Sequence, residues 1–172
     1  MEEPQNSFEI SIKDDFFDTG RFTQLHNEIP YKKYTPNTNH TSQYSHILFS
    51  VDVETPITQY IQAKCEKMLN KKFDLNFCMY TMVATVEPSV HWDYNKDCSH
   101  QVLIYIRGNQ DLHKGTGFYV KNGKDYQLNT HIGFRQNRAI FWDARTYHSP
   151  LNFAAEDQSK RFSIVAQYKE VK

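Results

Sequence analysis

Hydrophobic and polar residues follow two different patterns along the chain, and the first half alternates strands with helices. In residues 8–17, "FEISIKDDFF", Phe8, Ile10 and Ile12 alternate with polar neighbours, which predicts a half-buried strand. In residues 18–30, apolar residues spaced by three and four predict a short amphipathic helix, which Pro30 ends. The polar stretch 31–45 has no period and is expected to be a loop, and "HILFSVDV" over 46–53 is the next predicted strand.

The strongest helix signal lies in "TPITQYIQAKCEKMLNKKF", residues 55–73. Thr55 is a suitable N-cap, and Pro56 fits the first helical position. One apolar stripe follows, and its spacing predicts a packing helix with a solvated opposite face. The stripe contains Ile57, Tyr60, Ile61, Cys65, Met68 and Leu69.

From Asn76 onward the chain consists of short aromatic or β-branched runs separated by Gly, Asn, Asp and Lys, such as "QVLIYIRG", "GTGFYVKNG" and "NRAIFWDA". This spacing is typical of an antiparallel sandwich or barrel. We therefore predict a mainly β protein with flanking helices. Its 172 residues are expected to form a single domain, with an N-terminal strand and helix region over about 1–75 and a β-core over about 76–172.

Charge and cysteine content narrow the function classes. The 20 basic and 20 acidic side chains balance, so the overall charge does not favour nucleic-acid binding. No apolar run approaches the roughly 20 residues needed to cross a bilayer, and the polar start "MEEPQNSFEI" does not resemble a secretory signal. Three cysteines without a C-x-x-C pair are expected to be free thiols, which favours a cytoplasmic location.

A candidate metal site begins at "HWD", where His91 and Asp93 stand two residues apart on one face of an extended segment. With eight histidines and 20 acidic residues, roughly one such pair is expected by chance. A third ligand would have to come from a distant strand, and His148 in "YHSP" is the candidate. Two imidazoles and one carboxylate leave three open positions, the arrangement for non-haem Fe(II).

A candidate anion site follows at the head of the last predicted strand. Arg161 and Ser163 in "RFS" would lie on the same face of that strand. A guanidinium fork beside a hydroxyl suits one carboxylate end of a small dianion.

These motifs resemble those of the Fe(II)- and 2-oxoglutarate-dependent oxygenases, especially the prolyl-4-hydroxylase-like branch. The matching segments are "HWD", "YHSP" and "RFS", together with the strand "LIYIRG" and the segment "KGTGFYV". The opening strand and helix are also similar to the start of that branch. The chain departs from compact hydroxylases in the longer segment "SPLNFAAEDQSK" between His148 and Arg161.

The resemblance implies a double-stranded β-helix (jelly-roll) core with supporting N-terminal helices, and it assigns roles to residues. His91, Asp93 and His148 would hold Fe(II), with 2-oxoglutarate and O2 as cosubstrates. Arg161, Tyr105 and Ser163 would bind the far carboxylate of 2-oxoglutarate. Substrate contacts are expected from Tyr31 and Tyr34, if 31–45 closes as a lid, and from Trp142 at the pocket mouth; no catalytic nucleophile is expected.

The expected reaction is hydroxylation of an unactivated C–H bond, in the first instance of a prolyl residue in a peptide or protein, with release of succinate and CO2. Hydroxylation of a free amino acid or small metabolite stays open. Nucleic-acid demethylation is disfavoured, because the branch that performs it carries a second arginine on the last strand and "RFSIVAQYK" has none. A non-catalytic jelly-roll binding module is the alternative from another class.

Overall fold

The computed structural model describes residues 9–36, 46–83, 90–151 and 160–171. Two α-helices lie in the N-terminal half, α1 (Thr19–Glu28) and α2 (Pro56–Leu69), and the 3-10 turn η1 (Ile29–Tyr31) extends the first. The strands are β1 (Ile10–Lys13), β2 (Thr35–Pro36), β3 (His46–Val51), β4 (Lys72–Val83), β5 (His100–Arg107), β6 (Gly115–Asn122), β7 (Asp125–Gly133), β8 (Ala139–Asp143), β9 (Tyr147–Leu151) and β10 (Arg161–Val171).

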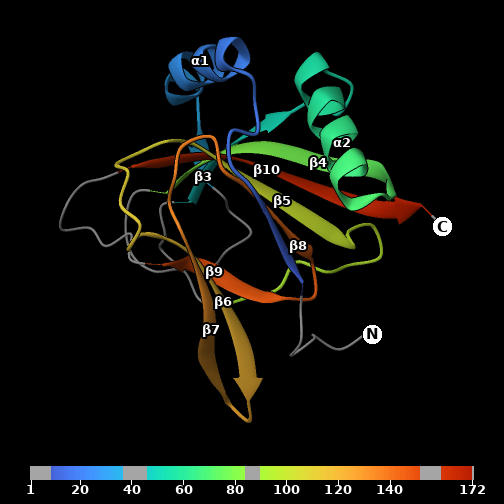
Figure 1. Ribbon diagram of the computed structural model, residues 1–172, viewed down its shortest axis with the longest axis vertical. Coiled ribbons are helices and arrows are strands. Elements are labelled where there is room, and N and C mark those ends of the chain that lie inside the picture. Colours follow the sequence, from blue (N-terminus) through green and yellow to red (C-terminus); the bar gives the residue numbers. More distant parts are fainter. Residues whose placement is uncertain (1–8, 37–45, 84–89, 152–159, 172) are drawn as a thin grey trace.

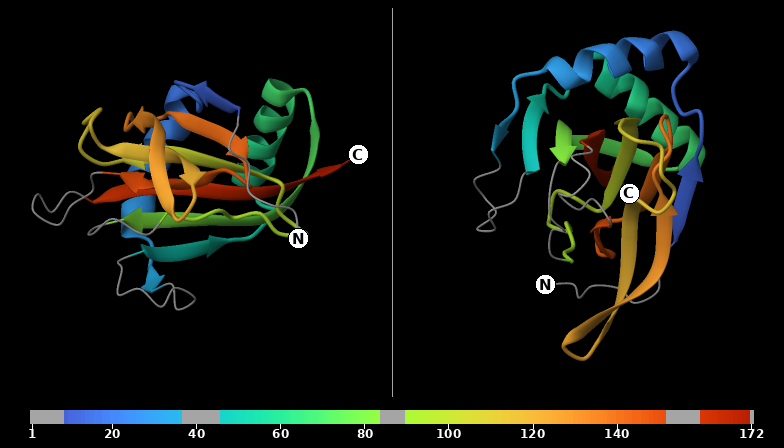
Figure 2. Two further views of the ribbon diagram at one scale, coloured as in Figure 1. Left: turned by 90° about the horizontal axis from the view of Figure 1, so that it is seen from below. Right: turned by 90° about the vertical axis from the view of Figure 1, so that its left-hand side faces the viewer.

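The strands form two antiparallel sheets. The major sheet has the order β1-β8-β5-β10-β4-β3-β2, and the minor sheet has the order β7-β6-β9. Both helices lie over one face of the major sheet, and the β6–β7 hairpin extends away from the helices (Figures 1 and 2). Neighbours such as β5 and β10 are far apart in sequence, so the major sheet is assembled largely by long-range pairing rather than by hairpins.

Two apolar clusters lie on opposite faces of the major sheet, as the period of two along a strand requires. The helix-side core contains Leu25, Ile61 and Cys65 from the helices together with alternate residues of the sheet. The inner core contains the other alternate residues of the major sheet together with residues of the minor sheet and the turn that follows β7. Its members are Val83, Leu103, Tyr105, Phe118, Ile132, Phe134, Ile140, Trp142 and Val165. The mainly β jelly-roll architecture with supporting helices is therefore confirmed.

Both predicted helices form, and their ends have the expected chemistry. Asp18 caps α1 by accepting a hydrogen bond from the Arg21 amide at 2.9 Å. Thr55 caps α2 by accepting from the amide of Thr58, and Pro56 occupies the first turn as predicted. Neither helix is long and apolar enough to cross a membrane, as far as the described residues show.

Two short strands differ from the sequence prediction. β2 lies within the stretch expected to be a loop, where Thr35 pairs with Leu48 of β3. β9 was not predicted, because Ser149 and Pro150 are poor strand formers. It forms because His148 and its neighbours pair along β6, with Phe118 opposite His148. This pairing, rather than local propensity, holds the proposed third ligand.

Candidate metal centre

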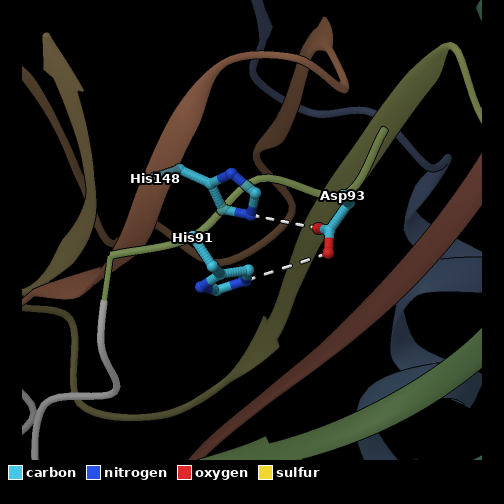
Figure 3. A group of neighbouring side chains, drawn as sticks. All are labelled: His91, Asp93 and His148. Carbon is cyan, nitrogen blue, oxygen red and sulfur yellow. Dashed lines mark ion pairs between the residues drawn. The ribbon is translucent and has the colours of Figure 1, made fainter. Parts of the chain in front are cut away.

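His91, Asp93 and His148 meet at one point of the inner face, where their ligand atoms all lie within 4.8 Å of one another (Figure 3). The two histidines form an isolated antiparallel bridge. The His91 amide donates to the His148 carbonyl at 3.0 Å, and the His148 amide donates to the His91 carbonyl at 2.8 Å. Directly opposite residues of an antiparallel pair project to the same side, so the backbone itself brings the two rings together.

Asp93 completes the triad from the segment that follows His91. Its Oδ2 lies 3.2 Å from His148 Nε2, and its Oδ1 lies 4.0 Å from His91 Nε2. Burial works to raise the pKa of Asp93, but the hydrogen bond with His148 and the charges of both imidazoles outweigh it and hold the pKa at about 2. The carboxylate is therefore ionised at neutral pH, as a metal ligand must be.

The orientation of the His148 ring is determined by a backbone carbonyl. His148 Nδ1 lies 3.0 Å from the carbonyl oxygen of Thr146. Because a carbonyl only accepts, Nδ1 carries a proton, which leaves Nε2, on the Asp93 side of the ring, as the nitrogen that would bind a metal. A histidine that donates its second ring N–H in this way is the usual form of a metal-binding imidazole.

Within the described residues, the triad is more exposed on the side of His91 and Asp93 than on the side of His148. The side chain of His148 is 6% exposed, whereas those of His91 and Asp93 are 32% and 25% exposed. The rings of Phe118 and Trp142 pack against His148, with centroid distances of 6.3 and 5.0 Å. Ligands would therefore approach from the His91 side, while the His148 side is closed by aromatic rings.

A second polar group lies in the same barrel interior, around Arg161. Arg161 is 3% exposed; its guanidinium donates to the Gly115 carbonyl at 3.1 Å and lies 5.4 Å from the centre of the Tyr105 ring. Burial lowers the pKa of Arg161, and the electrostatic interaction with Tyr105 opposes that shift. A buried cation of this kind is stabilised by an anionic ligand.

Tyr105 and Ser163 lie beside Arg161, as the sequence analysis expected. Ser163 pairs with Tyr105 across β10 and β5, and both side chains are fully buried. Burial raises the pKa of Tyr105, which keeps its hydroxyl protonated and able to donate. The Ser163 hydroxyl has no hydrogen-bond partner within the described residues. A buried hydroxyl of this kind is costly unless a ligand pairs with it.

Thr116 is a residue of this group that the sequence analysis missed. Its Oγ1 lies 2.7 Å from the Tyr105 hydroxyl, and its side chain is 2% exposed. Gly115 precedes it, and a Cβ there would collide with the Ile132 carbonyl, so the glycine lets β6 approach β7 closely. The segment "KGTGFYV" was recognised, but nothing in it indicated that Thr116 would face Tyr105.

Trp142 lies near the triad but not at a pocket mouth, which corrects that expectation. It is 2% exposed and belongs to the inner core, because its position on β8 points toward Phe118 and His148. Its indole nitrogen has no hydrogen-bond partner within the described residues. Trp92, which lies between the two ligands of the "HWD" segment, packs against the rings of Tyr94 and Tyr147.

The two tyrosines expected to contact substrate are not brought to the triad. Tyr34 packs against the helix-side core, where its ring meets Phe162 and its hydroxyl donates to the Ile29 carbonyl at 2.9 Å. It therefore lies on the helix-side face of the major sheet, across the sheet from the triad. Tyr31 is 81% exposed. The expected lid lies largely outside the described residues, as does the segment 152–159.

Comparisons with known proteins support the fold. No family model matches the chain, and no curated protein matches it in sequence. Among solved structures, the non-haem α-ketoglutarate-dependent epimerase SnoN from nogalamycin biosynthesis superposes with a TM-score of 0.70 at 14% identity, over 93% of this chain and 77% of that one.

Two prolyl hydroxylases are also similar. One, from Trichoplax adhaerens in complex with a hypoxia-inducible-factor peptide, has a TM-score of 0.65 at 13% identity over 92% of this chain and 82% of that one. A Pseudomonas putida prolyl-4-hydroxylase has a TM-score of 0.65 at 12% identity over 95% and 93% of the two chains. The chain thus has the double-stranded β-helix fold of the Fe(II)/2-oxoglutarate oxygenases, and the resemblance to the prolyl-hydroxylase-like branch is confirmed at the level of fold.

Proposed function

We propose that this protein is an Fe(II)- and 2-oxoglutarate-dependent dioxygenase that hydroxylates an unactivated C–H bond. The observation that carries the proposal is the convergence of His91, Asp93 and His148 within 4.8 Å on the inner face of the barrel. Two imidazoles and one carboxylate, open on one side, are the donor set that suits non-haem Fe(II). A fold alone would not support an activity, because one fold hosts many functions.

The second polar group fits 2-oxoglutarate. Arg161 offers a fixed fork of donors, and Tyr105, Thr116 and Ser163 add hydroxyls in a buried space. Such a set recognises one planar carboxylate and leaves the other end of a dianion free to reach the metal. Arg161, Tyr105 and Ser163 are therefore proposed as cosubstrate-binding residues, and Thr116 is added to them.

Fe(II) with 2-oxoglutarate and O2 would supply the oxidising chemistry, with succinate and CO2 as coproducts. The residues of this chain supply binding, orientation and exclusion of water. His148, held by the Thr146 carbonyl, and Asp93, ionised at neutral pH, provide fixed ligand atoms. Trp142 and Phe118 cover the His148 side with apolar rings, which directs incoming ligands to the more exposed His91 side.

For the substrate, we propose a prolyl residue in a peptide or protein, since two of the similar structures are prolyl hydroxylases. The alternative is a free amino acid or other small metabolite, and it is favoured by the likeness to SnoN, described as an epimerase of nogalamycin biosynthesis. Nucleic-acid demethylation and a non-catalytic module stay the less favoured alternatives. A single-domain enzyme over residues 1–172, located in the cytoplasm, is part of the proposal.

The test of the metal centre is anaerobic visible absorption after adding Fe(II) and 2-oxoglutarate to the purified protein. We expect a weak charge-transfer band in the wild type that is absent from His148→Ala. His113→Ala, which removes an exposed histidine of the β5–β6 loop, is the matched control and should keep the band. A folded wild type without the band would contradict the proposal and favour the binding module.

The substrate class is tested by product mass. Proline-containing peptides, free amino acids and small cyclic metabolites are offered in parallel with 2-oxoglutarate and O2. A gain of one oxygen on a peptide, coupled to succinate formation, would support the prolyl reading. Turnover with only the small molecules would support the alternative.

A further inference from the structure

Of the three side chains in the triad, that of Asp93 is the one whose direction is least fixed by its own backbone. His148 lies in β9 and His91 is bridged to it, but Asp93 lies between two elements. The amides of Asp93 and Tyr94 both donate to the Ala144 carbonyl, at 3.0 and 3.1 Å, which holds the backbone. These bonds do not determine how the side chain turns, so something else must set the direction of its two oxygens.

Gln101, the second residue of β5, lies against this carboxylate. Its side chain is 5% exposed, and a hydrogen-bonding interaction with the Asp93 carboxylate helps to lower the pKa of Asp93. It is also bonded to Gln167, the residue directly opposite on β10, whose Nε2 lies 3.1 Å from Gln101 Oε1. Three side chains from three segments thus form one continuous chain of hydrogen bonds.

The direction of these bonds follows from chemistry. An ionised carboxylate only accepts, so Gln101 must give its NH2 group to Asp93. Its carbonyl oxygen is then directed to Gln167, which must donate. The Gln101 amide therefore has a single orientation that satisfies both neighbours, and the bond from Gln167 holds it in that orientation.

The register of the sheet places this chain under the triad. Gln101 is paired with Gln167 on one side and with Trp142 on the other, so the three form one row across β10, β5 and β8. Trp142 packs against His148, while Gln101 bonds Asp93. The row therefore touches two of the three ligands. β10 also has a register shift against β4 between Gln167 and Tyr168, and such irregularities are common beside active sites.

We propose that Gln101, held by Gln167, is a positioning residue that fixes the Asp93 carboxylate for metal binding. It does not touch the metal or the substrate; it engages carboxylate lone pairs and keeps the others directed at the two imidazoles. Outer hydrogen bonds of this kind change metal affinity by about ten- to 100-fold in other metal sites. The inference rests on the proposed metal centre.

The experiment is a titration of the metal-free protein with Co(II), followed by its visible d–d absorption. The band intensity gives the affinity, and its position reports the ligand geometry. Gln101→Leu keeps the volume but removes the donor, and we expect Co(II) affinity to fall about ten- to 100-fold with a changed band. Gln167→Leu, at a partly exposed position, should weaken binding by a smaller factor because Gln101 keeps its bond to Asp93.

Gln127→Leu is the matched control, a glutamine-to-leucine change at an exposed strand position of β7, and it should bind as the wild type does. Thermal unfolding of each metal-free variant checks the fold. If Gln101→Leu does not fold, the Co(II) affinity of Gln167→Leu tests the positioning role in its place. If the wild type binds Co(II) and the folded variants match its affinity and spectrum, the positioning role is wrong while the metal centre stands. A wild type that binds no Co(II) would overturn both.

Discussion

At the scale of single residues, the candidate site depends on which atom of each side chain is left available. The Thr146 carbonyl occupies His148 Nδ1 and so leaves Nε2 for a metal. The Asp93 carboxylate is also ready to bind. Its pKa of about 2 means that the carboxyl group is already deprotonated at neutral pH, so it need not lose a proton when a cation binds. The donor atoms are thus prepared by neighbours that are not themselves ligands.

Arg161 carries the prediction at this scale. Arg161→Ala should weaken 2-oxoglutarate binding, because it removes a charge-assisted hydrogen bond of about 1.5–3 kcal/mol, which corresponds to roughly ten- to 150-fold in affinity. Binding is measured by titrating 2-oxoglutarate into the metal-loaded protein and following the charge-transfer band. Arg161→Lys should recover only part of the loss, because an ammonium lacks the planar fork.

Lys160→Ala is the matched control for that prediction, since Lys160 is the adjacent exposed cation. The role of Arg161 in binding 2-oxoglutarate would be contradicted if Lys160→Ala lost as much affinity for 2-oxoglutarate as Arg161→Ala, or if Arg161→Ala bound 2-oxoglutarate as the wild type does.

At the scale of elements, the turn between β7 and β8 fastens the N-terminal segment to the barrel. Asn137 has a positive φ of 62°, and its side chain accepts from the Phe17 amide at 2.8 Å and donates to the Phe17 carbonyl at 2.9 Å. Nearby, Asp14 forms ion pairs with Arg135 and Arg138 of the same turn. The backbone amide of Asn137 donates to Tyr105 at 2.8 Å, so this turn also supports the strand that lines the candidate site.

Asn137→Ala should lower the free energy of unfolding by about 2–4 kcal/mol, because it leaves buried polar groups of Phe17 without partners and because alanine tolerates positive φ less well than asparagine. Urea denaturation of the metal-free protein measures this. Asn137→Gly removes the backbone strain but not the lost hydrogen bonds, so it should recover part of the stability.

Asn70→Gly is the comparison for that pair of variants. Asn70 also has a positive φ, 51°, but it caps α2 through its backbone amide. Its replacement by glycine should change stability little. If Asn137→Gly were as stable as the wild type, the side-chain bonds to Phe17 would not be holding the N-terminal segment.

At the scale of the whole molecule, the two faces of the major sheet differ in composition: one forms an apolar core, and the other carries the candidate site. Its helix-side face is covered by α1 and α2 and forms a conventional apolar core. Its inner face carries aromatic residues together with the buried polar side chains of Arg161, Ser163 and Gln101, and Thr116 of the minor sheet contacts Tyr105 on this face. Burying so many polar groups costs stability unless ligands bind them, so the interior is expected to be stabilised by its ligands.

Metal binding should therefore raise the thermal stability of the whole chain. With Co(II) at about 100 times its Kd, linkage adds about 2.7 kcal/mol to the free energy of unfolding, or roughly 5–10 °C in Tm for a chain of this size. The shift is measured by thermal unfolding with and without metal. It should vanish in His148→Ala and persist in His113→Ala; a shift that survives in His148→Ala would indicate binding elsewhere.

The sequence by itself determined the order of the elements and the residue types of the site. The helix over residues 55–73 could be predicted because Thr55, Pro56 and the apolar stripe are local signals. The chemistry of His91, Asp93, His148 and Arg161 could be anticipated because two imidazoles, a carboxylate and a guanidinium have few joint uses. These inferences need no knowledge of which segments touch.

Only the tertiary structure decided which side chains face one another. β9 forms because its partner β6 imposes an extended backbone on a segment of weak propensity, and this is what brings His148 opposite His91. The burial of Trp142, the turn of Tyr34 into the helix-side core, and the contact of Thr116 with Tyr105 depend on long-range strand register. Strand register pairs residues that are far apart in the sequence and produces no local sequence pattern. It therefore could not be predicted from neighbouring residues.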